Sequence, residues 1–160
     1  MTRIKILFLA ALMVTGTVSS AQEAVDAKQW LTATITDYFN VDTTSHFRDI
    51  TTKRYAEYKQ DAINLVYDTP NSLTEAQFNQ KWGDVYDTSY AGIGESFLLG
   101  QQDHGVVVIS KCHLTSQTNN KNFIFDTIIS DTLFELTYSI EITVVQTKDG
   151  FKINDVKKRK

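Results

Sequence analysis

The hydrophobic period of this chain changes near residue 95, from a helical repeat to strict alternation. Residues 104–115, 122–130 and 135–146 alternate apolar and polar side chains, which is typical of strands with one buried face. Residues 148–150 read Lys-Asp-Gly, a tight hairpin turn before a last strand that begins at Phe151. Because such short turns join antiparallel neighbours, the second half predicts an antiparallel meander of four to five strands.

The first half of the chain predicts three helices. Residues 23–39 and about 52–67 carry apolar side chains at helical spacing. The third helix is short, because Thr74 and Gln77 form a capping box before it and Gly83 is placed to end it. Helices followed by a meander indicate an α+β fold, with N-terminal helices packed on one face of a curved antiparallel sheet.

The first 21 residues differ from the rest in composition. Arg3 and Lys5 precede an uninterrupted apolar run over residues 6–14, and Ser19-Ser20-Ala21 supplies small residues after it. This pattern predicts a signal peptide over residues 1–21, followed by a single domain over residues 22–160 that is exported to the periplasm or secreted. The alternative is a membrane anchor, but the apolar run is less than half the length that spans a bilayer. We therefore expect no membrane span once the leader is removed.

The charge of the expected mature chain narrows the class of partner. Loss of Arg3 and Lys5 takes the net charge from −3 to −5, and the last four residues, Lys157–Lys160, are all basic. Residues 22–156 then carry −9, which argues against nucleic acid and suits a basic protein partner. We expect the basic tail itself to be frayed and solvated. Cys112 is the only cysteine, so an intramolecular disulfide and a cysteine-rich zinc site are both excluded.

The order of these elements is similar to that of a known fold. The likeness rests on these short motifs: Tyr55-x-x-Tyr58-Lys59-x-Asp61-Ala62, Phe78-x-x-x-Lys81-Trp82, Tyr86-Asp87, Gly94-x-x-Phe97-Leu98, Gln102-Asp103, Ile129-x-Asp131 and Phe151-Lys152-Ile153-x-Asp155-Val156. Over roughly residues 23–157 the chain resembles small exported bacterial proteins of unknown function with a nuclear-transport-factor-like, or cystatin-like, cone. The wider fold includes isomerases, dehydratases, polyketide cyclases and non-catalytic binding or immunity modules, so the resemblance implies a fold and leaves the activity open.

Two loop-like segments carry the candidate binding residues. They are Asp84, Tyr86, Asp87 and Tyr90 after the third helix, and Gln102, Asp103 and His104 before the first long strand. Both segments could lie at the mouth of the cone, where Asp103 and His104 would be candidates for an acid–base pair tuned by burial. The alternative interpretation is that Asp84 and Asp103 cap turns through their own backbone. Tyr86 and Tyr90 lie outside the helical period and could line a pocket for an apolar ligand.

Other chemistries find little support. Asp84, Asp87, Asp103 and His104 match no calcium loop and no helical histidine pair, so we expect no metal and no cofactor. Ser96 follows Gly92 and Gly94, but Leu98 stands where a nucleophile elbow needs a second flanking glycine. We expect the two glycines to shape a bend before the first strand.

The outer face of the predicted sheet is a candidate partner surface. If no bulge intervenes, strand parity places on it Val107, Ile109, Lys111, His113, Ile124, Asp126 and Ile128. A half-apolar face of this kind suits contact with another protein or with a second copy of the chain. The alternative is a solvated antiparallel face that carries a few aliphatic side chains.

These observations favour a non-catalytic, exported protein-binding module. A specific version is an immunity or inhibitor protein, whose Asp84, Asp87 and Asp103 would meet a basic secreted hydrolase. The second possibility is a small-ligand receptor or enzyme that uses the cone mouth, with Asp103 and His104 as its acid–base pair. The third is a structural module of the cell envelope, for which no particular residue argues.

Overall fold

The computed structural model describes residues 20–40, 47–67, 72–95, 97–99, 103–118 and 121–159. Its elements in chain order are α1 (Ser20–Asn40), α2 (Phe47–Ile50), α3 (Lys53–Asn64), α4 (Glu75–Trp82), the 3₁₀ helix η1 (Thr88–Tyr90), β1 (Val107–Thr118), β2 (Asn122–Asp131), β3 (Leu136–Thr147) and β4 (Gly150–Arg159). The predicted signal peptide lies almost wholly outside the described residues, and its last two residues form the start of α1. No helix in the described part of the chain is long and apolar enough to cross a membrane.

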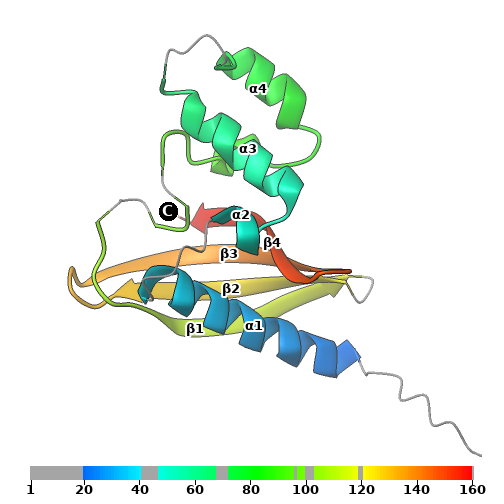
Figure 1. Ribbon diagram of the computed structural model, residues 1–160, viewed down its shortest axis with the longest axis vertical. Coiled ribbons are helices and arrows are strands. Elements are labelled where there is room, and N and C mark those ends of the chain that lie inside the picture. The colour runs from blue at the N-terminus through cyan, green and yellow to red at the C-terminus, as the bar shows by residue number, and fades with distance from the viewer. Residues whose placement is uncertain are drawn as a thin grey trace, which may run out of the picture.

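The four strands form one antiparallel sheet in the order β1-β2-β3-β4. Figure 1 shows that the sheet is curved and open, with helices packed against it, so the predicted α+β class is confirmed. The hairpin between β3 and β4 turns at Gly150, whose φ of +100° lies in the region that glycine favours. Four of the expected four to five strands are therefore present among the described residues.

Helix α1 covers one face of this sheet, lying mainly over β1 (Figure 1). Leu31 and Ile35 are fully buried on its inner side, at the helical spacing that the sequence indicated. Phe123, Phe125 and Ile142 bury their side chains from the sheet into the same core. We call this covered side the inner face and the opposite side the outer face.

Helices α3 and α4 stand beyond the β4 edge (Figure 1). The backbone N–H of Thr52 donates to the Ile153 carbonyl at 2.8 Å, and the Thr52 hydroxyl caps α3 by accepting from the Tyr55 N–H. Helix α4 begins with the predicted capping box, in which Thr74 and Gln77 each accept from the other's backbone. The chain is thus tied to the open edge of the sheet where α3 starts.

An aromatic cluster forms the core between α3, α4 and the segment that follows. Tyr58 stacks on Tyr86 with ring centres 4.4 Å apart and on Phe78 at 5.5 Å. Trp82 and Tyr55 contact the same rings, and all five side chains are buried. The sequence analysis named Tyr86 as a residue that could line a pocket, whereas its 5% exposure makes it part of this core.

The prediction that Val107 and Ile109 lie on the outer face is wrong. Val107 is fully buried and Ile109 packs against the core, because β1 contains a register shift between Ile109 and Lys111. A bulge adds one residue and reverses which face the following side chains point to. Lys111 and His113, which follow the bulge, therefore do lie outward, as predicted. Before the bulge the odd-numbered residues point inward instead.

The outer face carries a charged row that crosses β2, β3 and β4 and is continued on β1 by His113. His113 pairs in register with Asp126, Asp126 with Glu141, and Glu141 with Lys157. Ile124 and Ile128 flank Asp126 on the same side of β2 and are half-buried, as the predicted partner face requires. The expectation of a frayed tail is also wrong, because residues 157–159 belong to β4.

Candidate functional site

The predicted loop residues after α4 divide between core and surface. Asp84 is exposed, and Tyr86 lies in the aromatic core. Asp87 caps η1, since its carboxylate accepts from the backbone N–H of Ser89 at 3.1 Å and from the Ser89 hydroxyl at 2.6 Å. Tyr90 is 42% exposed and lines a cavity that is described below. The turn-capping interpretation therefore describes Asp87, for which it was not made.

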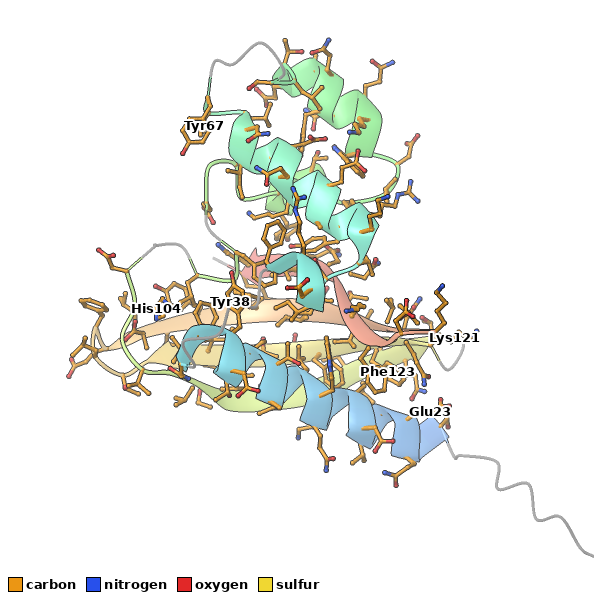
Figure 2. The ribbon with its side chains drawn as sticks, viewed as in Figure 1. Glu23, Tyr38, Tyr67, His104, Lys121 and Phe123 are labelled. Carbon is orange, nitrogen blue, oxygen red and sulfur yellow. The ribbon has the colours of Figure 1, made fainter. Side chains whose placement is uncertain are left out.

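Asp103 and His104 are both exposed, and Gln102 lies outside the described residues. The His104 ring packs edge-on against Phe39 of α1 with ring centres 5.1 Å apart, and its Nδ1 lies 3.1 Å from the Gly105 carbonyl oxygen. An acid–base pair tuned by burial needs shielding that neither side chain has. Figure 2 shows His104 beside the sheet, whereas the segment after α4 packs on α3 through Tyr86.

A buried lysine, which the sequence interpretation missed, contacts the loop that follows η1. Lys59 is 4% exposed, and its ammonium donates to the carbonyl oxygens of Ala91 at 2.9 Å and Gly92 at 3.0 Å. Burial lowers the pKa of Lys59 to about 8, with the positive charge of Lys158 acting in the same direction and Glu95 opposing it. A sequence signal did exist, because Lys59 interrupts the buried stripe of α3 between Tyr55 and Ala62.

The loop that receives this ammonium has an unusual backbone. Gly92 has a φ of +61°, and a Cβ added there would lie 3.0 Å from the Lys59 Nζ and 3.1 Å from the Glu95 Oε2. Gly94 and the buried Leu98 also have positive φ. Left-handed backbone costs free energy at a non-glycine residue, so Leu98 must be held there by its surroundings. The predicted bend at the two glycines is present, and it wraps around Lys59.

Glu95 pairs with a different lysine. Its Oε2 lies 2.8 Å from the Lys158 Nζ, and Lys158 also donates to the Leu99 carbonyl at 3.0 Å. The hydrogen bond from Lys158 lowers the pKa of Glu95 below its usual value, against the opposing effect of burial. In the described part of the chain no carboxylate lies within 4 Å of the Lys59 ammonium. Lys59 is therefore a buried cation held by two carbonyl dipoles.

Two cavities meet at Glu95. The larger, of about 490 Å³, is lined by Ser89, Tyr90, Gly92, Glu95, Lys158 and Arg159. The smaller, of about 240 Å³, is lined by Tyr38, Phe47, Lys59, Ile63, Tyr67, Gly94, Glu95 and Phe97. Two of these lining residues are labelled in Figure 2, Tyr38 near the end of α1 and Tyr67 beyond the end of α3. The smaller cavity combines aromatic walls with one buried ammonium, a common composition for a small-ligand site.

A second group of titratable side chains surrounds the carboxyl of Asp155 on β4. Burial raises the pKa of Asp155, and the charges of Glu141 and Asp87 act in the same direction. Burial also raises the pKa of Tyr86 to about 12, with a further contribution from Asp155. This group lies at the junction of the aromatic cluster and the sheet, where close packing buries the groups and so explains their raised pKa values.

The described residues contain no cluster of three or more histidine, cysteine, aspartate or glutamate side chains that could hold a metal ion. No model of a protein family, no curated protein and no solved structure matches this chain. The geometry of the outer face and of the cavities must therefore support any functional argument by itself.

Proposed function

We propose that this protein is an exported, non-catalytic binding module that recognises another protein. The observation that carries the proposal is the outer face of the sheet. None of the outward side chains of β2 and β3 is buried. Since a covered sheet face would bury them, no described segment of the chain covers this face. Ile124 and Ile128 lie on either side of the charged row there, and apolar side chains within a polar surround are typical of protein contact surfaces.

The exposed charges of the loops favour a basic partner. Lys157 and Arg159 already contact carboxylates within the sheet, with Arg159 lying 3.0 Å from Asp126. The loop carboxylates Asp84, Asp87 and Asp103 are exposed and remain available as charge partners. We propose that the partner is a basic effector enzyme and that this chain is its immunity or inhibitor protein. We also propose that the chain is related to the exported proteins with a nuclear-transport-factor-like fold that it resembles.

The test measures capture of basic proteins by the immobilised protein at low and high salt. We expect one basic enzyme to be retained one-to-one and inhibited, with an affinity that falls as salt screens the charges. The variant Asp84→Asn/Asp87→Asn/Asp103→Asn should weaken this binding about tenfold or more, because Asn can still cap η1 while the charge is lost.

The matched control is Asp26→Asn/Asp37→Asn/Glu75→Gln, which removes the same charge from exposed helical positions. It should leave the affinity within about a factor of three, since these charges belong to α1 and α4 and not to the loops. Binding that does not depend on salt, or that both triple variants weaken equally, would contradict the assignment of the loops. If the outer face instead joins two copies, sedimentation will show a dimer that Ile128→Asp dissociates.

The second candidate function is binding of a small ligand. The buried ammonium of Lys59 beside the smaller cavity favours it, since polar groups that point into an apolar pocket orient ligands. In this version the ligand site is that cavity, because Asp103 and His104 are exposed. An enzyme that uses Asp103 as acid or base would lose turnover in Asp103→Asn, and unchanged turnover would exclude that role.

A further inference from the structure

The smaller cavity has a composition that identifies the chemical class of its ligand. This inference rests on the small-ligand candidate and is independent of protein binding by the sheet. The cavity lies among the end of α1, α2, α3 and the loop around Gly94. Its volume of about 240 Å³ exceeds the roughly 150 Å³ that holds benzene, so by proportion a molecule of about ten heavy atoms fits.

The walls of this cavity are aromatic and pack against one another. Phe97 is 7% exposed and lies between two other rings, with its centre 5.6 Å from Tyr38 and 5.9 Å from Phe47. Ile63 adds an aliphatic side chain from α3. Because these side chains are fixed by mutual contact, the apolar part of the site is formed before a ligand enters.

The polar end of the cavity is the ammonium of Lys59. An ammonium has three N–H donors, and the carbonyls of Ala91 and Gly92 accept two of them. Glu95 also lines the cavity, but its carboxylate is paired with Lys158. One donor and one positive charge are therefore left for a ligand, within the part of the chain that the structure describes.

We propose that this cavity binds a small monocarboxylate with an apolar body, whose carboxylate pairs with Lys59 and whose body lies against Tyr38, Phe47 and Phe97. A single N–H matches a carboxylate better than a phosphate, whose three oxygens call for several donors. A cationic ligand would be repelled by Lys59 and by the nearby Lys158. A neutral ligand would leave the buried ammonium without a counter-charge.

Protonation of Lys59 gives the site a pH dependence. Since burial places the Lys59 pKa near 8, most of the population carries the positive charge at neutral pH. Above that value the amine becomes neutral and loses its attraction for a carboxylate. The groups that face Lys59 are Glu95, which lines the same cavity, and Lys158, whose ammonium pairs with Glu95. Glu95 stays ionised through this range, because the hydrogen bond from Lys158 lowers its pKa below the usual value.

The experiment is calorimetric titration of the purified protein with octanoate, 1-octanol and octyltrimethylammonium as probes. We expect octanoate to bind about tenfold or more tightly than either of the other two, since only octanoate forms the charged hydrogen bond. Its affinity should fall about tenfold per pH unit above pH 8, because binding requires one proton on Lys59.

Two variants locate the site. Lys59→Met should weaken octanoate binding about tenfold or more, whereas Lys53→Met, on the exposed side of the same helix, should leave the affinity unchanged. Phe47→Ala keeps the lysine and should weaken both octanoate and octanol, so it tests the wall even if Lys59→Met fails to fold.

The possible failures are distinguishable. Equal binding of octanoate and octanol, or an affinity independent of pH, would overturn the carboxylate class while leaving the cavity as a small-ligand site. Absence of binding by all three probes to the folded protein would overturn the small-ligand function itself. Neither result bears on salt-dependent binding of a basic protein.

Discussion

At the scale of single residues, Lys59 affects the stability of the fold as well as its chemistry. The ammonium holds the loop at Ala91 and Gly92 against α3, yet burying a charge without a carboxylate partner opposes folding. Its pKa of about 8 in the folded protein, compared with 10.5 for an ordinary lysine, measures that opposition. A residue that costs stability at neutral pH while it lines a cavity is an expected feature of a binding site.

This shift predicts how stability depends on pH. Between about pH 8 and pH 10 the unfolded chain binds a proton at Lys59 that the folded chain lacks, so the free energy of unfolding rises with pH. The contribution of Lys59 to the slope should approach about 1.4 kcal/mol per pH unit. Cys112 opposes it in the upper part of the range, because burial raises the pKa of its thiol and the folded state retains that proton. Above pH 10 the trend reverses, because burial raises the pKa of Tyr86 to about 12 and the folded state then retains the extra proton.

Urea unfolding across this range measures the effect. The rise between pH 8 and pH 10 should disappear in Lys59→Met and persist in Lys53→Met. A flat profile in the unmodified protein would mean that Lys59 is solvated in solution. This measurement needs no ligand, so it tests the burial of the ammonium independently of the proposed site.

Residue roles were predictable where local chemistry alone decides them. Thr74 and Gln77 form a capping box whatever surrounds them. Asp131, by contrast, stands in the sequence just after the alternating run of residues 122–130, in the motif Ile129-x-Asp131. In the fold its carboxylate is buried and accepts from the backbone N–H groups of Gly105, Leu133 and Phe134. Such a role depends on contacts between distant segments, which spacing does not reveal.

At the scale of elements, the strands show where sequence patterns fail. Alternation identified β1 correctly as a strand, but it could not reveal the register shift between Ile109 and Lys111. A bulge leaves the residue types unchanged and alters only which face each side chain meets. β2 and β3 pair with each other without a shift, and Phe123, Phe125 and Ile142, on the face opposite to Ile124 and Asp126, are all buried.

The cap of α4 gives a prediction for this scale. Thr74→Ala removes the hydroxyl that accepts from the Gln77 N–H, so we expect the free energy of unfolding to fall by about 1 kcal/mol. Thr74→Ser keeps the hydroxyl and should remain close to the unmodified protein. Chemical denaturation of the two variants measures the difference. If alanine and serine have the same effect, α4 does not depend on its cap.

At the scale of the whole molecule, the C-terminal residues determine how the net charge is distributed over the surface. Residues 157–159 extend β4 and bring their positive charges against acidic groups. Arg159 lies 3.0 Å from Asp126 and 2.9 Å from Glu141, and Lys158 pairs with Glu95. The exposed acidic side chains therefore lie mainly away from the outer face of the sheet, on the helices and in the loops. Composition gives the total charge. The position of each charge depends on strand pairing, and the sequence did not predict that residues 157–159 would be paired in β4.

The C-terminal residues thus have two separable roles, in backbone pairing and in charge. Deletion of residues 157–160 removes the pairing of β4 with Glu141, Ile140 and Ser139 of β3, and should lower the free energy of unfolding by about 2 kcal/mol. Replacing Lys157, Lys158 and Arg159 together by glutamine keeps that pairing and removes the charges. Because partly exposed ion pairs contribute little, this variant should lose only about 1 kcal/mol.

Salt separates the two roles in thermal or urea unfolding. Added salt should bring the glutamine variant closer to the unmodified protein, since it screens the ion pairs that the variant lacks. The loss caused by deletion should persist at high salt, because hydrogen bonds between strands are not screened in this way. A frayed, solvated tail predicts instead that neither change alters stability at any salt concentration. The deletion variant at high salt therefore decides between a fourth strand that runs to Arg159 and one that ends before the basic residues.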